Sequence, residues 1–62
     1  MANPSKRYPW IVQMFVPSLD QWFDIDAYSE QLVAQVLIKL ARRRAPGTEF
    51  RVKRYDSSKD KE

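Results

Sequence analysis

The chain contains no cysteine, no histidine and a single glycine among its 62 residues. The missing cysteines exclude disulfides and thiol nucleophiles, and the missing histidines exclude imidazole bases and zinc sites of the Cys/His type. No apolar run approaches the ~20 residues of a transmembrane helix. Residues 1–7 also lack the ~7–15-residue apolar segment of a signal peptide. We therefore expect a cytoplasmic protein that has no cofactor, no metal and no membrane partner.

The length and the charge set further bounds. Sixty-two residues make at most one domain, and a chain this short buries only about 60% of the surface of its unfolded form. Without disulfides, stability must come from a compact aromatic-rich core or from oligomerisation. The net charge of +3 permits nucleic acid, acidic proteins or anionic lipid as partners without selecting one. The polar ends predict disordered tails at 1–8 and 56–62 around one domain at 9–55.

Hydrophobic periodicity predicts a β–β–α–β order. The expected elements are a strand over 9–16, a turn over 17–20, a strand over 21–27, a helix over 30–44 and a strand over 49–55. The helix has a plausible N-cap at Ser29 or Asp26, and Pro46-Gly47 ends it.

The helix is expected to be amphipathic. At ~100° per residue, one apolar stripe contains Leu32, Val33, Val36, Leu37 and Leu40. The opposite face is polar, and Ile38 is a misfit there. We expect the apolar stripe to pack against the sheet.

The first strand is apolar on both faces, which predicts that it lies at the centre of the sheet. The third strand follows a helical crossover, so it should run parallel to the second and antiparallel to the first. We predict an α+β fold with an antiparallel sheet of order 2-1-3 and charged edge strands. The helix should then cover Val12, Met14, Phe23, Ile25, Phe50 and Val52.

The other sheet face is expected to be open. Its predicted centre holds Ile11, Gln13 and Phe15, flanked by Trp22, Asp24 and Asp26 on one side and by Arg51, Lys53 and Tyr55 on the other. Aromatic residues and arginine are enriched at binding hot spots. Such a face can be a contact surface, or Phe15 and Trp22 can simply pair across the strands and shield each other.

Two basic clusters lie close together in the sequence. Arg42, Arg43 and Arg44 end the helix, where cations ordinarily complement the helix dipole. Arg51, Lys53 and Arg54 follow after a short turn, so the two clusters can instead form one patch for phosphates or an acidic protein surface. Aromatics beside basic strands are also typical of sheets that stack bases.

Catalysis is disfavoured. Without histidine or cysteine, a nucleophile would need a Ser–Lys or carboxylate arrangement. Asp24 and Asp26 would lie about 7 Å apart on one strand face, but a chain this small has little volume for an enclosing pocket. We expect them to be solvated edge residues of a protein that is not an enzyme.

The layout resembles the small inhibitors of host RNA polymerase that podophages make. The resemblance rests on Pro9-Trp10-Ile-Val, on an alternating second strand leading into a capped helix, and on Ala45-Pro-Gly followed by Phe50-x-Val-x-Arg54. It implies a three-stranded sheet with one helix, and a last strand whose arginines contact an acidic surface of the polymerase. Arg54 falls on one such position, while Asp56 replaces the arginine expected two residues later.

Three hypotheses for function follow. The first is a binding protein that occludes a host macromolecule, which is bacterial RNA polymerase if the resemblance holds. Its candidate contact residues are Arg51, Lys53, Arg54, Tyr55, Trp22, Phe15, Arg42, Arg43 and Arg44. The second is a nucleic-acid-binding protein. The third is a homodimer formed through the open face or through Ile38, so the chain is expected to be a monomer or a weak homodimer.

Overall fold

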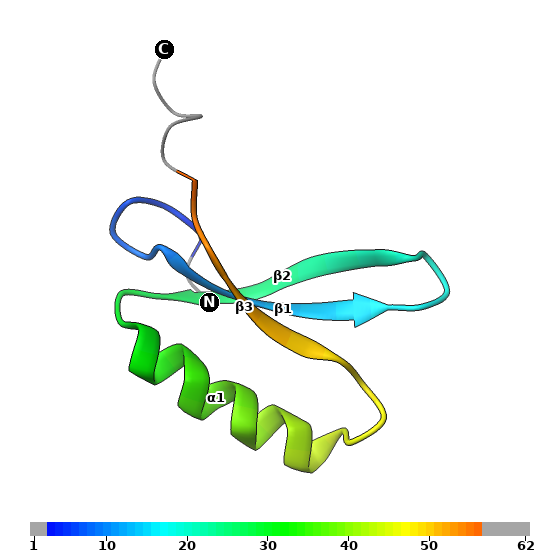
Figure 1. Ribbon diagram of the computed structural model, residues 1–62. Coiled ribbons are helices and arrows are strands. Elements are labelled where there is room, and N and C mark those ends of the chain that lie inside the picture. Colours follow the sequence, from blue (N-terminus) through cyan, green and yellow to red (C-terminus); the bar gives the residue numbers. More distant parts are fainter. Residues whose placement is uncertain (1–2, 57–62) are drawn as a thin grey trace.

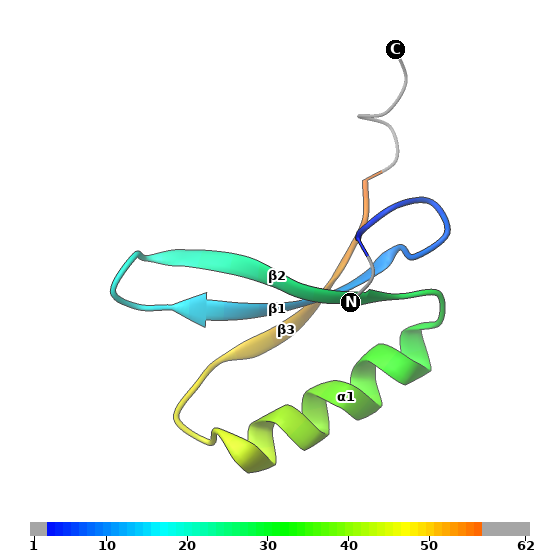
Figure 2. The same cartoon turned by 180° about the vertical axis from the view of Figure 1, so that it is seen from behind.

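The computed structural model describes residues 3–56 and has the predicted architecture (Figure 1). Its elements are β1 (Trp10–Val16), β2 (Gln21–Tyr28), α1 (Gln31–Arg44) and β3 (Phe50–Arg54). The sheet is antiparallel in the order β2-β1-β3, and α1 lies along one of its faces (Figures 1 and 2). The predicted α+β fold and sheet order are confirmed. The expected tail residues 1–2 and 57–62 lie outside the described residues.

The central strand is buried on both of its faces. Ile11, Val12 and Gln13 are all buried in β1, and each has a partner on both neighbouring strands. A strand with two covered faces needs apolar side chains on both, which is why this segment does not alternate. The two-sided strand thus takes the middle position that the sequence predicts.

The pairing of β1 with β2 shifts register between Val12 and Gln13. Gln13 pairs with Asp24 and Val12 pairs with Asp26, so Ile25 is an extra residue in β2. Such a bulge moves the following side chains to the opposite faces. The prediction that Asp26 shares the open face with Asp24 is therefore wrong. Asp26 lies on the α1 side, where it accepts hydrogen bonds from the Tyr28 hydroxyl at 2.8 Å and the Ala27 amide at 2.9 Å.

The helix packs through a different face from the one predicted. Ala34 is fully buried and Ile38 is 5% exposed, whereas the expected inward stripe is 37–69% exposed. That exposed set is Leu32, Val33, Val36, Leu37 and Leu40. Ala34, Ala41 and Ala45 recur at helical spacing, and their small side chains let α1 approach the sheet closely. Ile38 then fills the space beside Val12 and Phe50.

The core is small. Its buried cluster consists of Val12, Ala34, Ile38 and Phe50, against which Trp10, Met14, Ile25, Tyr28, Ala41, Ala45 and Val52 pack in part. No large side chain among residues 3–56 reaches complete burial, and Phe23, which the helix was expected to cover, is 38% exposed. The fold therefore leaves more apolar surface uncovered than the sequence predicted.

The ends of α1 are set by backbone geometry. Its N-cap is Glu30 rather than Ser29 or Asp26, and no side chain caps it. The three arginines occupy the last turn, and the Ala45 amide donates to the Ala41 carbonyl at 2.9 Å. Basic side chains in this turn complement the helix dipole, as expected.

The segment before β1 is hydrogen-bonded although the sequence predicts a tail there. Ser5 and Tyr8 exchange two backbone hydrogen bonds of 3.3 and 3.1 Å, which close a turn. The Tyr55 amide then donates to the Pro9 carbonyl at 2.7 Å and extends the β1–β3 ladder beyond the strand ends. The Ser5–Tyr8 turn thus lies within the expected N-terminal tail, and the Tyr55–Pro9 bond joins the two ends of the expected domain.

Candidate binding surface

The open face is the side of the sheet turned away from α1, and a ladder of polar side chains crosses its centre. Gln13 Nε2 donates to Asp24 Oδ1 at 2.7 Å, and Arg51 Nε donates to Gln13 Oε1 at 2.7 Å. Backbone register explains the ladder, because Gln13 pairs with Asp24 on β2 and with Arg51 on β3. The single amide thus links an acidic edge of the sheet to a basic edge.

Arg51 also covers the open face. Its guanidinium carbon lies 4.0 Å from the centroid of the Trp22 ring, although Trp22 belongs to the far strand β2. The Phe15 and Trp22 rings are 5.3 Å apart and tilted by 55°. The cation–π contact contributes about 0.5–1 kcal/mol at an exposed site, and the aromatic pair about 0.5–1.5 kcal/mol.

This arrangement corrects the expected exposure of the central residues. Ile11 and Gln13 were expected at the centre of an exposed face, but they are 5% and 7% exposed. The Arg51 side chain reaches across β1 to Trp22, and Gln13 is satisfied at both ends of its amide. The group exposed on the open face is therefore the Arg51 guanidinium, which Trp22 and Gln13 hold in place.

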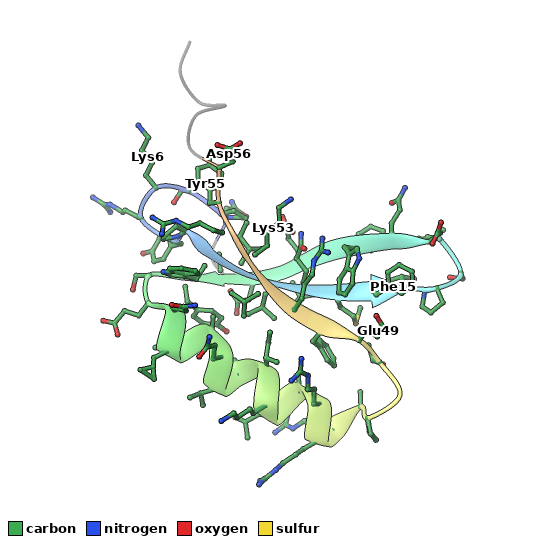
Figure 3. All side chains as sticks on the ribbon, in the orientation of Figure 1. Lys6, Phe15, Glu49, Lys53, Tyr55 and Asp56 are labelled. Carbon is green, nitrogen blue, oxygen red and sulfur yellow. The ribbon has the colours of Figure 1, made fainter. Side chains whose placement is uncertain are left out.

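Arg54 lies on the opposite side of the sheet from Arg51. It pairs with Trp10, and its guanidinium carbon lies 5.0 Å from the centroid of the Trp10 ring. Lys53 pairs with Ile11 on the open face and is exposed. Figure 3 shows Lys53 and Tyr55 toward the end of β3 away from Phe15. The structure thus brings together Phe15, Trp22 and Arg51, but separates Arg54 from them.

The basic end of α1 adjoins β3. Arg42 Nη2 donates to the Phe50 carbonyl at 3.3 Å, while Arg43 and Arg44 are exposed in the same turn. A cavity of about 390 Å³ lies between the helix and the strand, lined by Gln35, Ile38, Lys39, Arg42, Phe50, Arg51 and Val52. Arg42 therefore connects the two basic clusters that are separated by a short turn in the sequence.

β3 is an edge strand whose outer side is available for pairing. The bonds from Phe15 to Glu49 and from Tyr55 to Pro9 show that odd-numbered residues of this segment turn their backbone toward β1. Val52 and Arg54 consequently point their backbone groups outward. Basic side chains on such an edge discourage pairing with other copies of a similarly charged strand.

Two supporting residues were absent from the predicted contact set. Trp10 positions Arg54 and Gln13 positions Arg51. The signal that could have found them is the sheet register, since both lie on the central strand directly opposite an arginine of β3. With the predicted order 2-1-3, aligning the first and third strands residue by residue would have placed Trp10 opposite Arg54 and Gln13 opposite Arg51.

One tyrosine has a perturbed acidity. Burial raises the pKa of Tyr28 above its ordinary value of 10.0, and the hydrogen bond to Asp26 and the negative charge of that carboxylate raise it further. This pair lies on the α1 side of the sheet and takes no part in the Arg51 cluster. The raised pKa of Tyr28 makes the folded state lose stability at high pH.

No family model, curated protein or solved structure matches this chain. Within residues 3–56, no helix is long and apolar enough to cross a membrane. The same part of the chain contains no group of three or more acidic side chains able to hold a metal ion.

Proposed function

We propose that this is a small non-enzymatic binding protein that attaches through β3 to an acidic surface of a host protein and blocks that protein. The observation that carries the proposal is the pair of arginines on one edge strand, each held over a tryptophan. Arg51 is supported by Trp22 and Gln13 on the open face, and Arg54 by Trp10 on the other side. β3 itself contains no acidic residue.

The support matters because ordering a long side chain costs free energy on binding. An immobilised flexible side chain costs about 0.5–1.5 kcal/mol at an interface. Stacking and the Gln13 bond restrict Arg51 before a partner arrives. Guanidinium groups also bind carboxylates in a bidentate geometry that a lysine cannot reproduce. A pre-ordered arginine on an edge strand is therefore suited to acidic side chains of another protein.

The resemblance to podophage inhibitors supports bacterial RNA polymerase as the target. Arg54 occupies a position where that family uses an arginine against an acidic surface, and it lies on the exposed edge of the sheet. Asp56 stands where the family has a second arginine. In this proposal Arg51, which is ordered by its own contacts, supplies the second guanidinium instead.

The test is capture of purified bacterial RNA polymerase by the immobilised full chain, with inhibition of transcription as a second measurement. Arg51→Glu and Arg54→Glu should each lower the affinity at least tenfold. Arg43→Glu makes the same change of charge at the helix end and should retain capture. No capture by the wild-type chain would reject the polymerase as target, and loss with Arg43→Glu alone would reject β3 as the contact surface.

A nucleic-acid-binding protein is the second candidate, because Arg42 joins the helix-end cluster to β3. Phosphate binding by such a patch would weaken steeply with salt, since each neutralised phosphate releases counterions. The Trp22 ring is already contacted by Arg51 and Phe15, which disfavours base stacking there. Flat fluorescence titrations with single- and double-stranded DNA and RNA at low salt would eliminate this candidate.

A further inference from the structure

We infer that the outer side of α1 is an interface between two copies of this chain, which pack with their helices antiparallel. The surface concerned is the outer stripe, defined as Leu32, Val33, Val36, Leu37 and Leu40. It lies on α1 beside the face that packs on the sheet, and the views of residues 3–56 show no other element beyond the helix (Figures 1 and 2). The inference is independent of the proposed role of β3.

The first observation is that α1 is apolar around most of its circumference. One face buries Ala34 and Ile38 against the sheet, and the outer stripe presents five aliphatic side chains that are 37–69% exposed. Together these five expose on the order of 400 Å², similar to the largest patch of an ordinary and much larger monomer. The apolar surface of α1 is therefore wider than the face that packs on the sheet, and an exposed apolar patch of this size marks an interaction site.

The second observation is the small core of the monomer. Only six hydrophobic residues among the described part of the chain are buried, two of them alanines, and the sequence has no cysteine. Proteins of this length commonly compensate by oligomerisation when disulfides and metals are missing. Covering the outer stripe would add the apolar burial that the single copy lacks.

The third observation is that the stripe is self-complementary. Leu32, Val36 and Leu40 are spaced by four residues along one row of the helix. At 1.5 Å per residue, the two leucines lie about 6 Å on either side of Val36. A two-fold axis at Val36 would place Leu32 of one copy against Leu40 of the other, twice.

The charges favour the same arrangement. Arg42, Arg43 and Arg44 lie at one end of α1, and Glu30 is at the other. Antiparallel packing places the three arginines of each copy beside Glu30 of the other copy. Parallel packing would place six arginines together. The charge pattern therefore selects a second copy in one orientation.

The interface is expected to be weak. A cavity of about 350 Å³ continues the stripe toward the core, lined by Leu37, Leu40, Ala41, Arg44, Ala45 and Phe50, and it can receive side chains of the second copy. Two stripes and their margins bury about 1,000 Å² in total, which is the low end for specific interfaces. We expect a dissociation constant on the order of 10 µM.

Analytical ultracentrifugation of the full chain between about 1 µM and 1 mM tests the inference. The wild type should change from monomer to dimer across this range, and Leu40→Glu should stay monomeric with an unchanged far-UV circular dichroism spectrum. Gln35→Glu introduces the same side chain on the other flank of α1 and should dimerise like the wild type. A wild-type monomer at 1 mM, or a dimer that Leu40→Glu leaves intact, would overturn the inference.

The orientation has its own test, because the chain has no native cysteine. In the antiparallel dimer of the Val36→Cys variant, the introduced cysteines of the two copies should form a disulfide with each other. The introduced cysteines of the Leu32→Cys variant should not. A mixture of Leu32→Cys and Leu40→Cys should form the mixed disulfide. Self-crosslinking of Leu32→Cys at the rate of Val36→Cys would refute the antiparallel arrangement, since these side chains would lie about 12 Å apart along the axis.

A membrane surface is the main competing occupant, because basic helices with an apolar stripe can lie at lipid interfaces. Sedimentation with phosphatidylglycerol vesicles separates the two cases. The dimer inference predicts no binding of the wild type to such vesicles at 0.15 M salt. Binding by a monomeric wild type that Leu40→Glu abolishes would overturn the dimer and assign the outer stripe to lipid.

Discussion

The packing of α1 leads to a prediction that contrasts two neighbouring positions. Ile38 is 5% exposed and belongs to the core cluster, whereas Leu40 is 47% exposed. Ile38→Ala should therefore destabilise the fold by about 2–5 kcal/mol, the usual cost of truncating a buried isoleucine. Leu40→Ala removes a side chain that is already half in water and raises helix propensity, so it should cost less than about 1 kcal/mol.

The size of the effect decides how it must be measured. A domain of this length has only about 3–9 kcal/mol of stability at 0.05–0.15 kcal/mol per residue, so Ile38→Ala can unfold the chain. Ile38→Val should cost about 0.5–1.5 kcal/mol and keep the protein folded. Urea denaturation followed by tryptophan fluorescence, at about 1 µM to avoid dimers, should rank the variants Ile38→Ala, Ile38→Val and Leu40→Ala in decreasing cost. A larger loss for Leu40→Ala than for Ile38→Ala would refute the packing described here.

Three further predictions concern the turn, the ladder and the tyrosine. Asp20 has a positive φ of 52°, so in urea denaturation Asp20→Val should lower the free energy of unfolding by about 1–2 kcal/mol and Asp20→Gly should be nearly neutral. Gln13→Leu removes both hydrogen bonds of the ladder and should lower the free energy of unfolding. The loss should be only about 1 kcal/mol, because the exposed Asp24 and Arg51 can bond to water instead. An unchanged urea midpoint would argue against the ladder. The raised pKa of Tyr28 contributes stability that is present below pH 10 and is lost as the pH rises through the folded-state pKa. Ultraviolet titration should show one tyrosine ionising late, and Tyr28→Phe should remove that step.

The sheet topology could be predicted because two independent constraints agree. A strand that is apolar on both faces must be central, and a helical crossover fixes the direction of the strand that follows it. Both hold for β1 and β3. The order of the strands therefore required no knowledge of individual contacts.

The orientation of α1 could not be predicted in the same way. Apolar residues occupy two adjacent stripes, and the larger side chains of the outer stripe dominate any hydrophobicity average. The stripe of Ala34, Ile38 and Ala41 packs against the sheet because its small residues allow close packing. Periodicity shows that a helix is amphipathic, but the distance of approach decides which stripe is buried.

The bulge in β2 could not be predicted from the sequence for a related reason. Phe23 to Ala27 alternate without interruption, so the sequence predicts that Asp24 and Asp26 share a face. The register shift places them on opposite sides of the sheet. It also gives Asp26 the Tyr28 hydroxyl as a partner. Pairing with the central strand, rather than local pattern, determines where these carboxylates lie.

The most direct test of the helix packing is a solution NMR measurement of contacts between methyl groups. Nuclear Overhauser effects should connect the Ile38 methyl groups with Val12, because both belong to the buried cluster. Val36, on the outer stripe, should show none to Val12 within one copy. Strong intramolecular contacts of Val36 with Val12, and their absence for Ile38, would contradict the orientation of α1 and the dimer surface that follows from it.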